Sequence, residues 1–382
     1  MKSTLAVICH APAGESPLEQ AIHSARRASA EDLIGLLHEF AVRVVVATPD
    51  REDANAFRSL GANVQPTPAD DSFHFGMTLA EIVRGTDAQS VLYFGSGSGG
   101  LLERQHVARL CTFAERKEDA ALFNNFYSCD FAVITNRRAV LEASLPSKDN
   151  GLGFALAEAG THCYALPRDA ASQFDIDVPT DLHLLKHFGR GGDALRRFLR
   201  SWPSAHPSLG NLCSLLTDRK AVVYLAGRIQ PGTWQSFELA TACRTGGFIE
   251  GRGMKASPNG RSPLLGAVAS DDPVRFFDRL ASAADGAILD TRPLLAAGGE
   301  LPPAGDRFAS DLFLPREIVD PRWRAFTEAA MNAAIPVVLG GHNLVSGGLL
   351  LLADECWKGQ DFPRRLHPES FGWKRSPDDA IP

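Results

Sequence analysis

The chain has 382 residues, of which 45% are hydrophobic and 22% are charged, a balance typical of a folded protein that excludes a largely disordered chain. A formal net charge of -6 offers no basic surface for DNA or RNA, so no nucleic-acid partner is expected. The length exceeds what one ordinary hydrophobic core supports, and two domains are expected.

Short apolar runs alternate with helical patterns through the first half of the chain. Strands are predicted at residues 5–9, 42–47, 90–94 and 131–134, and helices at residues 30–40, 78–83 and 101–116. This alternation predicts parallel strands joined by right-handed crossovers, and therefore a layered α/β domain. The segment from Trp202 to Asn211 is rich in turn-forming residues and is the expected linker, which gives a first domain of residues 1–202.

The second half contains another α/β series. Strands are predicted at residues 222–226, 247–250, 287–290 and 336–339, and helices at residues 273–284, 322–334 and 349–357. Four strands with intervening helices favour a second three-layer α/β domain, which would span residues 212–382.

Seven cysteines occur singly, without the Cys-x-x-Cys spacing that is typical of zinc sites and redox dithiols. This dispersed set predicts reduced thiols in a cytoplasmic protein. Because no apolar stretch approaches membrane-spanning length, no membrane partner is expected.

The segment of residues 174–182, with the sequence FDIDVPTDL, places two carboxylates just before a proline and a predicted helix start. If the segment is extended, Asp175 and Asp177 point to the same side, as would suit Mg²⁺ carrying a nucleotide phosphate. The alternative is a strand end followed by a helix, with Thr180 or Asp181 as the cap and the pair merely solvated.

This Asp-x-Asp-x-Pro-x-Asp-Leu segment resembles the closing motif of small nucleotidyltransferases, notably the molybdenum-cofactor guanylyltransferase and phospholactate guanylyltransferase families. The resemblance covers about the first half of the chain, and the second half resembles no family. It implies a GT-A-like α/β fold in which Asp175 and Asp177 hold Mg²⁺. It also implies transfer of a nucleoside monophosphate from a nucleoside triphosphate to a small phosphorylated or hydroxylated acceptor. The nucleotide and the acceptor are then the expected partners, and a homo-oligomer remains open.

Two segments depart from the pattern of these families. The loop at residues 10–18 has one glycine and no Lys or Arg, and so is a poor phosphate cradle. After the strand at residues 90–94, Ser98 stands about where the families place a second metal-binding aspartate, and Asp130 is the candidate replacement.

The glycine-rich turn around Ser98 has two interpretations. A turn between a strand and a helix suits anion binding, which makes Gly95, Gly97, Ser98 and Gly99 candidate nucleotide or anion-binding residues. Alternatively, the glycines only allow a tight turn.

Asn125 and Ser128 precede the strand at residues 131–134, and their side chains could bind a base or sugar or satisfy each other in a turn.

The second half has its own polar constellation. Residues 340–348 form a glycine-rich loop between a strand and a helix, which suits phosphate or carboxylate binding. The candidate ligand site of this half combines that loop with other strand ends, and consists of Asp290, Arg292, Asp311, Gly341, His342 and Ser346. Asp290 and Arg292 could instead form a local ion pair.

The sequence therefore predicts a two-domain α/β nucleotidyltransferase-like protein. One alternative is a protein that binds a nucleotide or sugar nucleotide without catalysis, as a sensor or scaffold. Another is a glycosyltransferase, because fold alone does not decide function.

Overall fold

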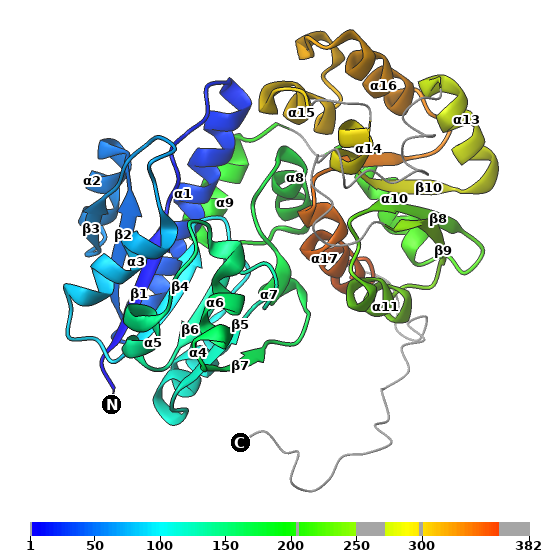
Figure 1. Cartoon of the computed structure of the whole chain (residues 1–382). Helices are drawn as coiled ribbons and strands as arrows, with labels where there is room; N and C mark the ends of the chain where they lie inside the picture. Colours follow the sequence, from blue (N-terminus) through cyan, green and yellow to red (C-terminus); the bar gives the residue numbers. More distant parts are fainter. Residues whose placement is uncertain (1, 204–205, 250–271, 298–300, 359–382) are drawn as a thin grey trace, which may run out of the picture.

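A computed structural model describes residues 2–203, 206–249, 272–297 and 301–358 (Figure 1). Within them the strands form two separate sheets, which confirms the prediction of two α/β units. The first sheet has seven strands in the order β3-β2-β1-β4-β6-β5-β7, and the second has four in the order β11-β10-β8-β9.

The first sheet is mixed, whereas the sequence predicted parallel strands. Its strands are β1 (Thr4–Cys9), β2 (Arg43–Thr48), β3 (Asn63–Pro66), β4 (Ser90–Gly95), β5 (Ala120–Phe123), β6 (Phe131–Ile134) and β7 (His162–Ala165). Strand β6 runs antiparallel to both of its neighbours, β4 and β5. The four-residue strands β3, β5 and β7 were not predicted, because β3 and β7 are edge strands without a buried apolar run and β5 is too short to show a period.

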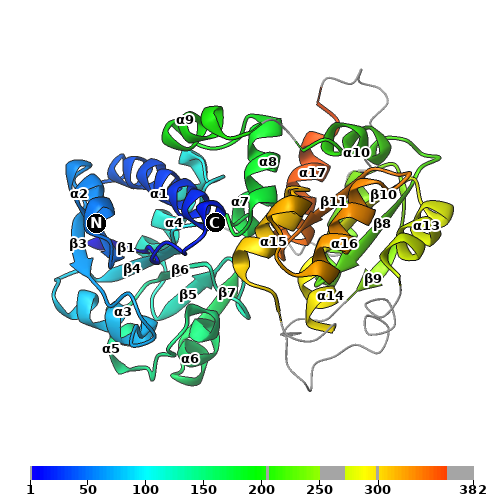
Figure 2. The same ribbon diagram turned by 90° about the horizontal axis from the view of Figure 1, so that it is seen from above.

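Helices cover both faces of this sheet (Figure 2). They are α1 (Pro17–His38), α2 (Arg51–Ser59), α3 (Phe75–Arg84), α4 (Arg104–Arg116), α5 (Arg137–Glu142) and α6 (Leu152–Glu158). Three more helices, α7 (Ala170–Gln173), α8 (Pro179–Phe188) and α9 (Asp193–Ser201), belong to the core shared with the second half. Alternate side chains of β1 divide between the two faces. Leu5 and Val7 pack with α3, α5 and α6, while Ala6 and Ile8 pack with α1, α2 and α4. Helix α1 begins well before the predicted residue 30, because Ser16 and Glu19 form a capping box.

The second sheet is parallel throughout. Its strands are β8 (Val222–Gly227), β9 (Arg244–Ile249), β10 (Gly286–Asp290) and β11 (Val337–Gly340). The flanking helices are α10 (Leu209–Leu216), α11 (Pro231–Ala240), α13 (Pro273–Ala283), α14 (Thr291–Ala297), α15 (Ala304–Asp311), α16 (Pro321–Met331) and α17 (Gly347–Glu355). The strand predicted at 247–250 begins earlier, and residue 250 lies outside the described residues. Among the described helices, none is both long and apolar enough to span a lipid bilayer.

One hydrophobic core joins helices of the first half to the second sheet. It includes Ile22 of α1, Leu182 of α8 and Leu349 of α17, together with Val223 of β8 and Ile288 of β10. Helices α8 and α17 lie side by side between the sheets, and α17 also packs on α7 (Figures 1 and 2). Because α8 directly follows the segment containing Asp175, the packing of the second half positions the candidate metal-binding motif.

A glycine in this junction tests that dependence. A Cβ at Gly347 would overlap the backbone of Phe174 and the carbonyl oxygen of Gln173, neither of which can move independently. We expect Gly347→Ala to lower the free energy of unfolding by about 1–3 kcal/mol through overpacking. Gly210→Ala is the control, because no atom lies within 4 Å of its Cβ position in α10, and it should stabilise by up to about 1 kcal/mol. Equal denaturation midpoints for the two variants in urea would contradict the close approach.

Candidate functional site

A pocket of about 580 Å³ opens at the carboxyl ends of β1, β2 and β4. Ligands commonly bind at this edge of an open α/β sheet. The predicted Gly95, Gly97 and Ser98 line it, as do Asp130 and Asp175. The remaining charged lining residues among those that the structure describes are Arg26, Asp70, Asp71, Lys148 and Asp149.

The antiparallel direction of β6 brings Asp130 to this edge. Asp130 directly precedes β6, so the amino end of that strand lies beside the carboxyl end of β4, with Phe94 opposite Phe131. The buried Asn124 fixes the carboxylate: its amide nitrogen donates to Asp130 Oδ2 at 2.8 Å, and its carbonyl oxygen accepts from the Asp130 backbone nitrogen at 3.0 Å. Asn124 is therefore a positioning residue that the sequence analysis missed, although it adjoins Asn125.

Asp175 reaches the same place from the far end of the first half. It forms an isolated antiparallel bridge with Ser98, and the backbone nitrogen of Ile176 donates to the Gly97 carbonyl at 3.0 Å. A Cβ at Gly97 would overlap Asp175 Oδ1, so glycine at this position lets the carboxylate approach the turn. The turn after β4 and the Asp motif thus form one local structure.

Burial raises the pKa of both Asp130 and Asp175. Burial, together with the nearby charges of Asp177 and Asp149, raises the pKa of Asp130 to about 7 despite the hydrogen bond from Asn124. Burial and the charges of Asp177 and Asp130 raise the pKa of Asp175 well above its usual range. Two carboxyls that repel each other in a buried position would gain from a cation between them.

Asp177 faces a different partner. Its carboxylate, 42% exposed, accepts from Arg26 Nη2 at 2.8 Å, and Arg26 Nε also donates to the Ile176 carbonyl at 2.5 Å. Asp177 does not line the pocket, whereas Arg26 does. The two motif carboxylates therefore have different surroundings: Asp175 lies at the pocket and Asp177 pairs with α1.

The Ser98 hydroxyl is already engaged. It donates to the Gly95 carbonyl at 2.7 Å and lies 3.1 Å from the Asp130 carbonyl, and the residue is 2% exposed. The backbone of Gly99 has a φ of 78°, a conformation that favours glycine. These contacts support the tight-turn interpretation and leave Ser98 poorly placed as a metal ligand.

Asn125 and Ser128 lie in a turn outside the pocket lining. The side-chain oxygen of Asn125 accepts from the Tyr127 backbone nitrogen at 3.3 Å. Ser128 Oγ donates to Asn150 Oδ1 at 2.6 Å. These contacts fit the turn interpretation of both residues.

In the second half, the charged residues of the predicted ligand site pair within the protein. Asp290 is fully buried and accepts from Arg228 Nε at 2.7 Å. Burial raises the pKa of this carboxyl, but the Arg228 guanidinium outweighs it and holds the pKa below its usual range. Arg292 forms a bidentate pair with Asp311, which ends α15, at 3.1 and 2.7 Å. Its partner is thus Asp311 rather than Asp290.

The glycine-rich loop at residues 340–348 packs against the first half. A Cβ at Gly341 would lie 3.0 Å from Val178 Cγ1, and Ser346 is buried while His342 is half-buried. Asn343 links the halves: its side-chain oxygen accepts from the Asp175 backbone nitrogen at 3.0 Å, and its amide donates to Asp181 Oδ1 at 2.8 Å.

Asp181 also accepts from the backbone nitrogens of Asp177 and Val178, both at 2.8 Å. The N-cap of α8 is therefore Val178 rather than Thr180 or Asp181, and Asp181 supports the helix start from the first turn. The role of Asn343 had no local signal, because both partners are distant in sequence.

No protein-family profile and no curated protein matches the chain in sequence. Roughly half of it is similar to solved structures of nucleotidyltransferases. A proposed nucleotide-diphospho-sugar transferase from Desulfovibrio desulfuricans is 12% identical, with a TM-score of 0.39 over 52% of this chain and 95% of that one. A nucleotidyl transferase from Methanothermobacter thermautotrophicus is 13% identical, with a TM-score of 0.38 over 52% and 99%. A cytidylyltransferase from Leptospira borgpetersenii is 11% identical, with a TM-score of 0.36 over 52% and 93%. Likeness this distant does not identify a substrate or an activity.

The ion pair between Arg292 and Asp311 gives a stability prediction. Arg292→Ala would leave the Asp311 carboxylate buried without its charged partner, and we expect it to lower the free energy of unfolding by about 3–5 kcal/mol. Arg322→Ala is the control, because that side chain is 78% exposed beside Asp320 and should cost at most about 1 kcal/mol. Chemical denaturation of both variants measures the difference. An unchanged midpoint for Arg292→Ala would show that this pair does not stabilise the fold.

Proposed function

We propose that the pocket binds a nucleoside triphosphate as its Mg²⁺ complex, and that the protein transfers the nucleoside monophosphate to a small phosphorylated or hydroxylated acceptor. The observation that carries this proposal is the convergence of Asp130 and Asp175 beside the turn from Gly95 to Ser98, at the carboxyl edge of the sheet. The pocket volume of about 580 Å³ falls in the range of small-molecule sites.

The donor set fits Mg²⁺. This ion prefers oxygen ligands and commonly takes one or two carboxylates, with water and phosphate oxygens completing its shell. We assign Asp130 and Asp175 as those carboxylates, with Asp177 adding negative charge nearby while it pairs with Arg26. When bound, the ion would neutralise triphosphate charge. The contribution of the chain is to hold the two carboxylates in place through Asn124 and Gly97.

The charge of the pocket favours a metal complex over a free nucleotide. Among the described lining residues, five carboxylates face two cationic side chains, Arg26 and Lys148. Ionisation of the buried Asp130 and Asp175 carboxyls, whose pKa values are raised, would create a surplus of negative charge that repels a free triphosphate and attracts a divalent cation. Nucleotide binding should therefore depend on a divalent cation.

A second candidate is a nucleotide or sugar-nucleotide binder without catalysis. Two observations favour it: the Ser98 hydroxyl donates to the Gly95 carbonyl, and the loop at residues 10–16 has no Lys or Arg to hold a phosphate. An engaged hydroxyl and a loop without cationic side chains leave fewer groups to stabilise a charged transition state.

Replacing Asp175 tests the metal assignment. We expect Asp175→Asn to weaken Mg²⁺-dependent nucleotide binding about 10-fold or more, because it removes a charged oxygen ligand while preserving shape. Asp177→Asn should have a smaller effect, since that carboxylate pairs with Arg26. Asp87→Asn is the distant control, because Asp87 is exposed and pairs with Arg43. Calorimetric titration with each common nucleoside triphosphate, with and without Mg²⁺, measures these affinities, and equal values for wild type and Asp175→Asn would contradict the assignment.

Turnover separates the two candidates. If the protein is an enzyme, a nucleoside triphosphate, Mg²⁺ and a panel of phosphorylated or hydroxylated acceptors should yield pyrophosphate, and Asp130→Asn should abolish the release. Tight Mg²⁺-dependent binding without pyrophosphate release across the panel would support the binder instead.

The raised carboxyl pKa values predict a pH dependence that needs no substrate. In the folded protein Asp130 has a pKa of about 7, against 3.8 for an ordinary carboxyl, so the folded state holds the proton that the unfolded state has lost between these values. Without metal, the free energy of unfolding should therefore fall as pH rises from 4 through 7. Mg²⁺ should raise the melting temperature more at pH 8 than at pH 5. Asp130→Asn should weaken both trends without abolishing them, because the pKa of Asp175 is raised as well. An Mg²⁺ effect that does not change with pH would contradict the prediction.

A further inference from the structure

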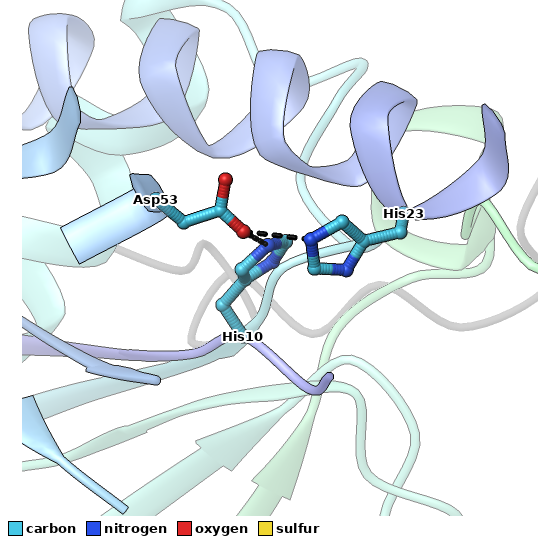
Figure 3. A group of neighbouring side chains, drawn as sticks. All are labelled: His10, His23 and Asp53. Atoms are coloured by element: carbon cyan, nitrogen blue, oxygen red, sulfur yellow. Dashed lines mark hydrogen bonds and ion pairs between the residues drawn. The ribbon is translucent and has the colours of Figure 1, made fainter. Parts of the chain in front are cut away.

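Two histidines converge on one carboxylate beside the pocket (Figure 3). His10 Nε2 lies 3.0 Å and His23 Nε2 lies 2.6 Å from the same oxygen, Asp53 Oδ2. The three ligand-type atoms all lie within 4.8 Å of one another. The two imidazole rings are 4.4 Å apart and tilted by 39°. Neither the resemblance to nucleotidyltransferases nor the proposed Mg²⁺ site accounts for this group.

Each member is held by a different element. His10 follows β1, and its backbone nitrogen donates to the Ala47 carbonyl at 2.8 Å. His23 lies in the first half of α1. Asp53 lies in the first turn of α2, where the Asp50 cap accepts from its backbone nitrogen at 2.9 Å. Because three separately anchored elements present the group, its geometry does not depend on one flexible loop.

The arrangement is close to a metal centre. Ligands 2.0–2.1 Å from a tetrahedral ion are about 3.3 Å from one another, whereas His10 Nε2 and His23 Nε2 lie 3.0 Å and 2.6 Å from Asp53 Oδ2. An ion would therefore move these nitrogens away from Oδ2, by about 0.3 Å for His10 and about 0.7 Å for His23. Two imidazoles with one carboxylate suit Zn²⁺, Fe²⁺ and similar ions rather than Mg²⁺, which prefers oxygen.

The surrounding contacts match those of ligating side chains. His10 Nδ1 lies 2.9 Å from Ser96 Oγ, so a proton on Nδ1 can be donated to the hydroxyl while Nε2 faces an ion. Asp53 Oδ1 accepts from Arg27 Nη1 at 3.0 Å, which leaves Oδ2 for the ion. Burial lowers the pKa of His10, which favours the neutral imidazole that a metal ion requires.

The local charge also favours a divalent ion. Arg27 pairs with Glu31, Glu52 and Asp53 at 3.3, 3.6 and 3.0 Å, so in the described part of the chain three carboxylates face one guanidinium. Apart from the two imidazoles, this cluster carries two excess negative charges. The other nearby guanidinium, of Arg26, is itself paired with Asp177.

We propose that His10, His23 and Asp53 form a binding site for a divalent transition-metal ion such as Zn²⁺, with water completing its coordination. The ion joins β1, α1 and α2 next to the pocket, which His10 also lines. Without an ion, the same side chains form a hydrogen-bonded cluster in which both Nε2 atoms donate to Asp53. The two states differ in the protonated nitrogen of each imidazole, and this difference can be measured.

The test is a titration of chelator-treated protein with Zn²⁺ and with Co²⁺, whose absorption reports imidazole coordination. We expect one equivalent to bind, and His23→Asn to weaken Zn²⁺ binding more than about 100-fold, because loss of outer-shell partners alone typically costs 10–100-fold. His38→Asn is the matched control, since His38 is an exposed histidine on the same helix. Asp175→Asn should leave Zn²⁺ binding unchanged, which separates this site from the proposed Mg²⁺ site.

Zn²⁺ should raise the melting temperature of wild type and of His38→Asn but not of His23→Asn. Equal Zn²⁺ affinity in wild type and His23→Asn would overturn the proposal and leave the cluster as a hydrogen-bonded tie. If His23→Asn does not fold, nitrogen NMR of the wild-type imidazoles decides. Zn²⁺ should move the protons of His10 and His23 from Nε2 to Nδ1, and unchanged spectra would equally overturn the site.

Discussion

The geometry of the candidate site depends most on the two hydrogen bonds of the Asn343 side-chain amide. Asn343 is 2% exposed, and its side chain connects the loop after β11 to the Asp175 backbone and to the Asp181 carboxylate in the first turn of α8. A buried amide with both ends paired costs little, whereas an unpaired one would cost about 1–3 kcal/mol. Since these partners lie in different halves of the chain, the motif has its present geometry only when the halves are packed together. The shared hydrophobic core has the same consequence.

The raised pKa values of the pocket carboxyls follow from the antiparallel direction of strand β6. With β6 antiparallel, Asp130 lies at the edge where β4 ends, opposite the bridge between Ser98 and Asp175. Two carboxyls are thereby buried close together with little compensating charge, and their raised pKa values express that cost. A cation bound between the two carboxylates would offset that cost.

Helix α1 links the two candidate metal sites. Arg26 holds Asp177 and the Ile176 carbonyl, while the neighbouring Arg27 holds Asp53, to which His23 also points. One helix thus contacts both the proposed Mg²⁺ site and the proposed transition-metal site. A change in the position of α1 would alter both proposed metal sites. Comparing Asp175→Asn with His23→Asn would distinguish a local effect at one site from an effect on the helix.

The sequence alone determined the elements whose signals are local. Buried apolar runs identified β1, β2, β4 and β6, and the helix start at Pro179 was visible from a proline and Asp181. Asp130 could be named because it adjoins such a run, and Asp175 because it belongs to the Asp-x-Asp-x-Pro motif. Tertiary structure decided what depends on strand order and packing: the direction of β6, the choice of Asp311 as the partner of Arg292, and the meeting of His10, His23 and Asp53. Hydrophobic periodicity reports which face of an element is buried, but not which distant element packs against it, so these contacts had no signal in the sequence.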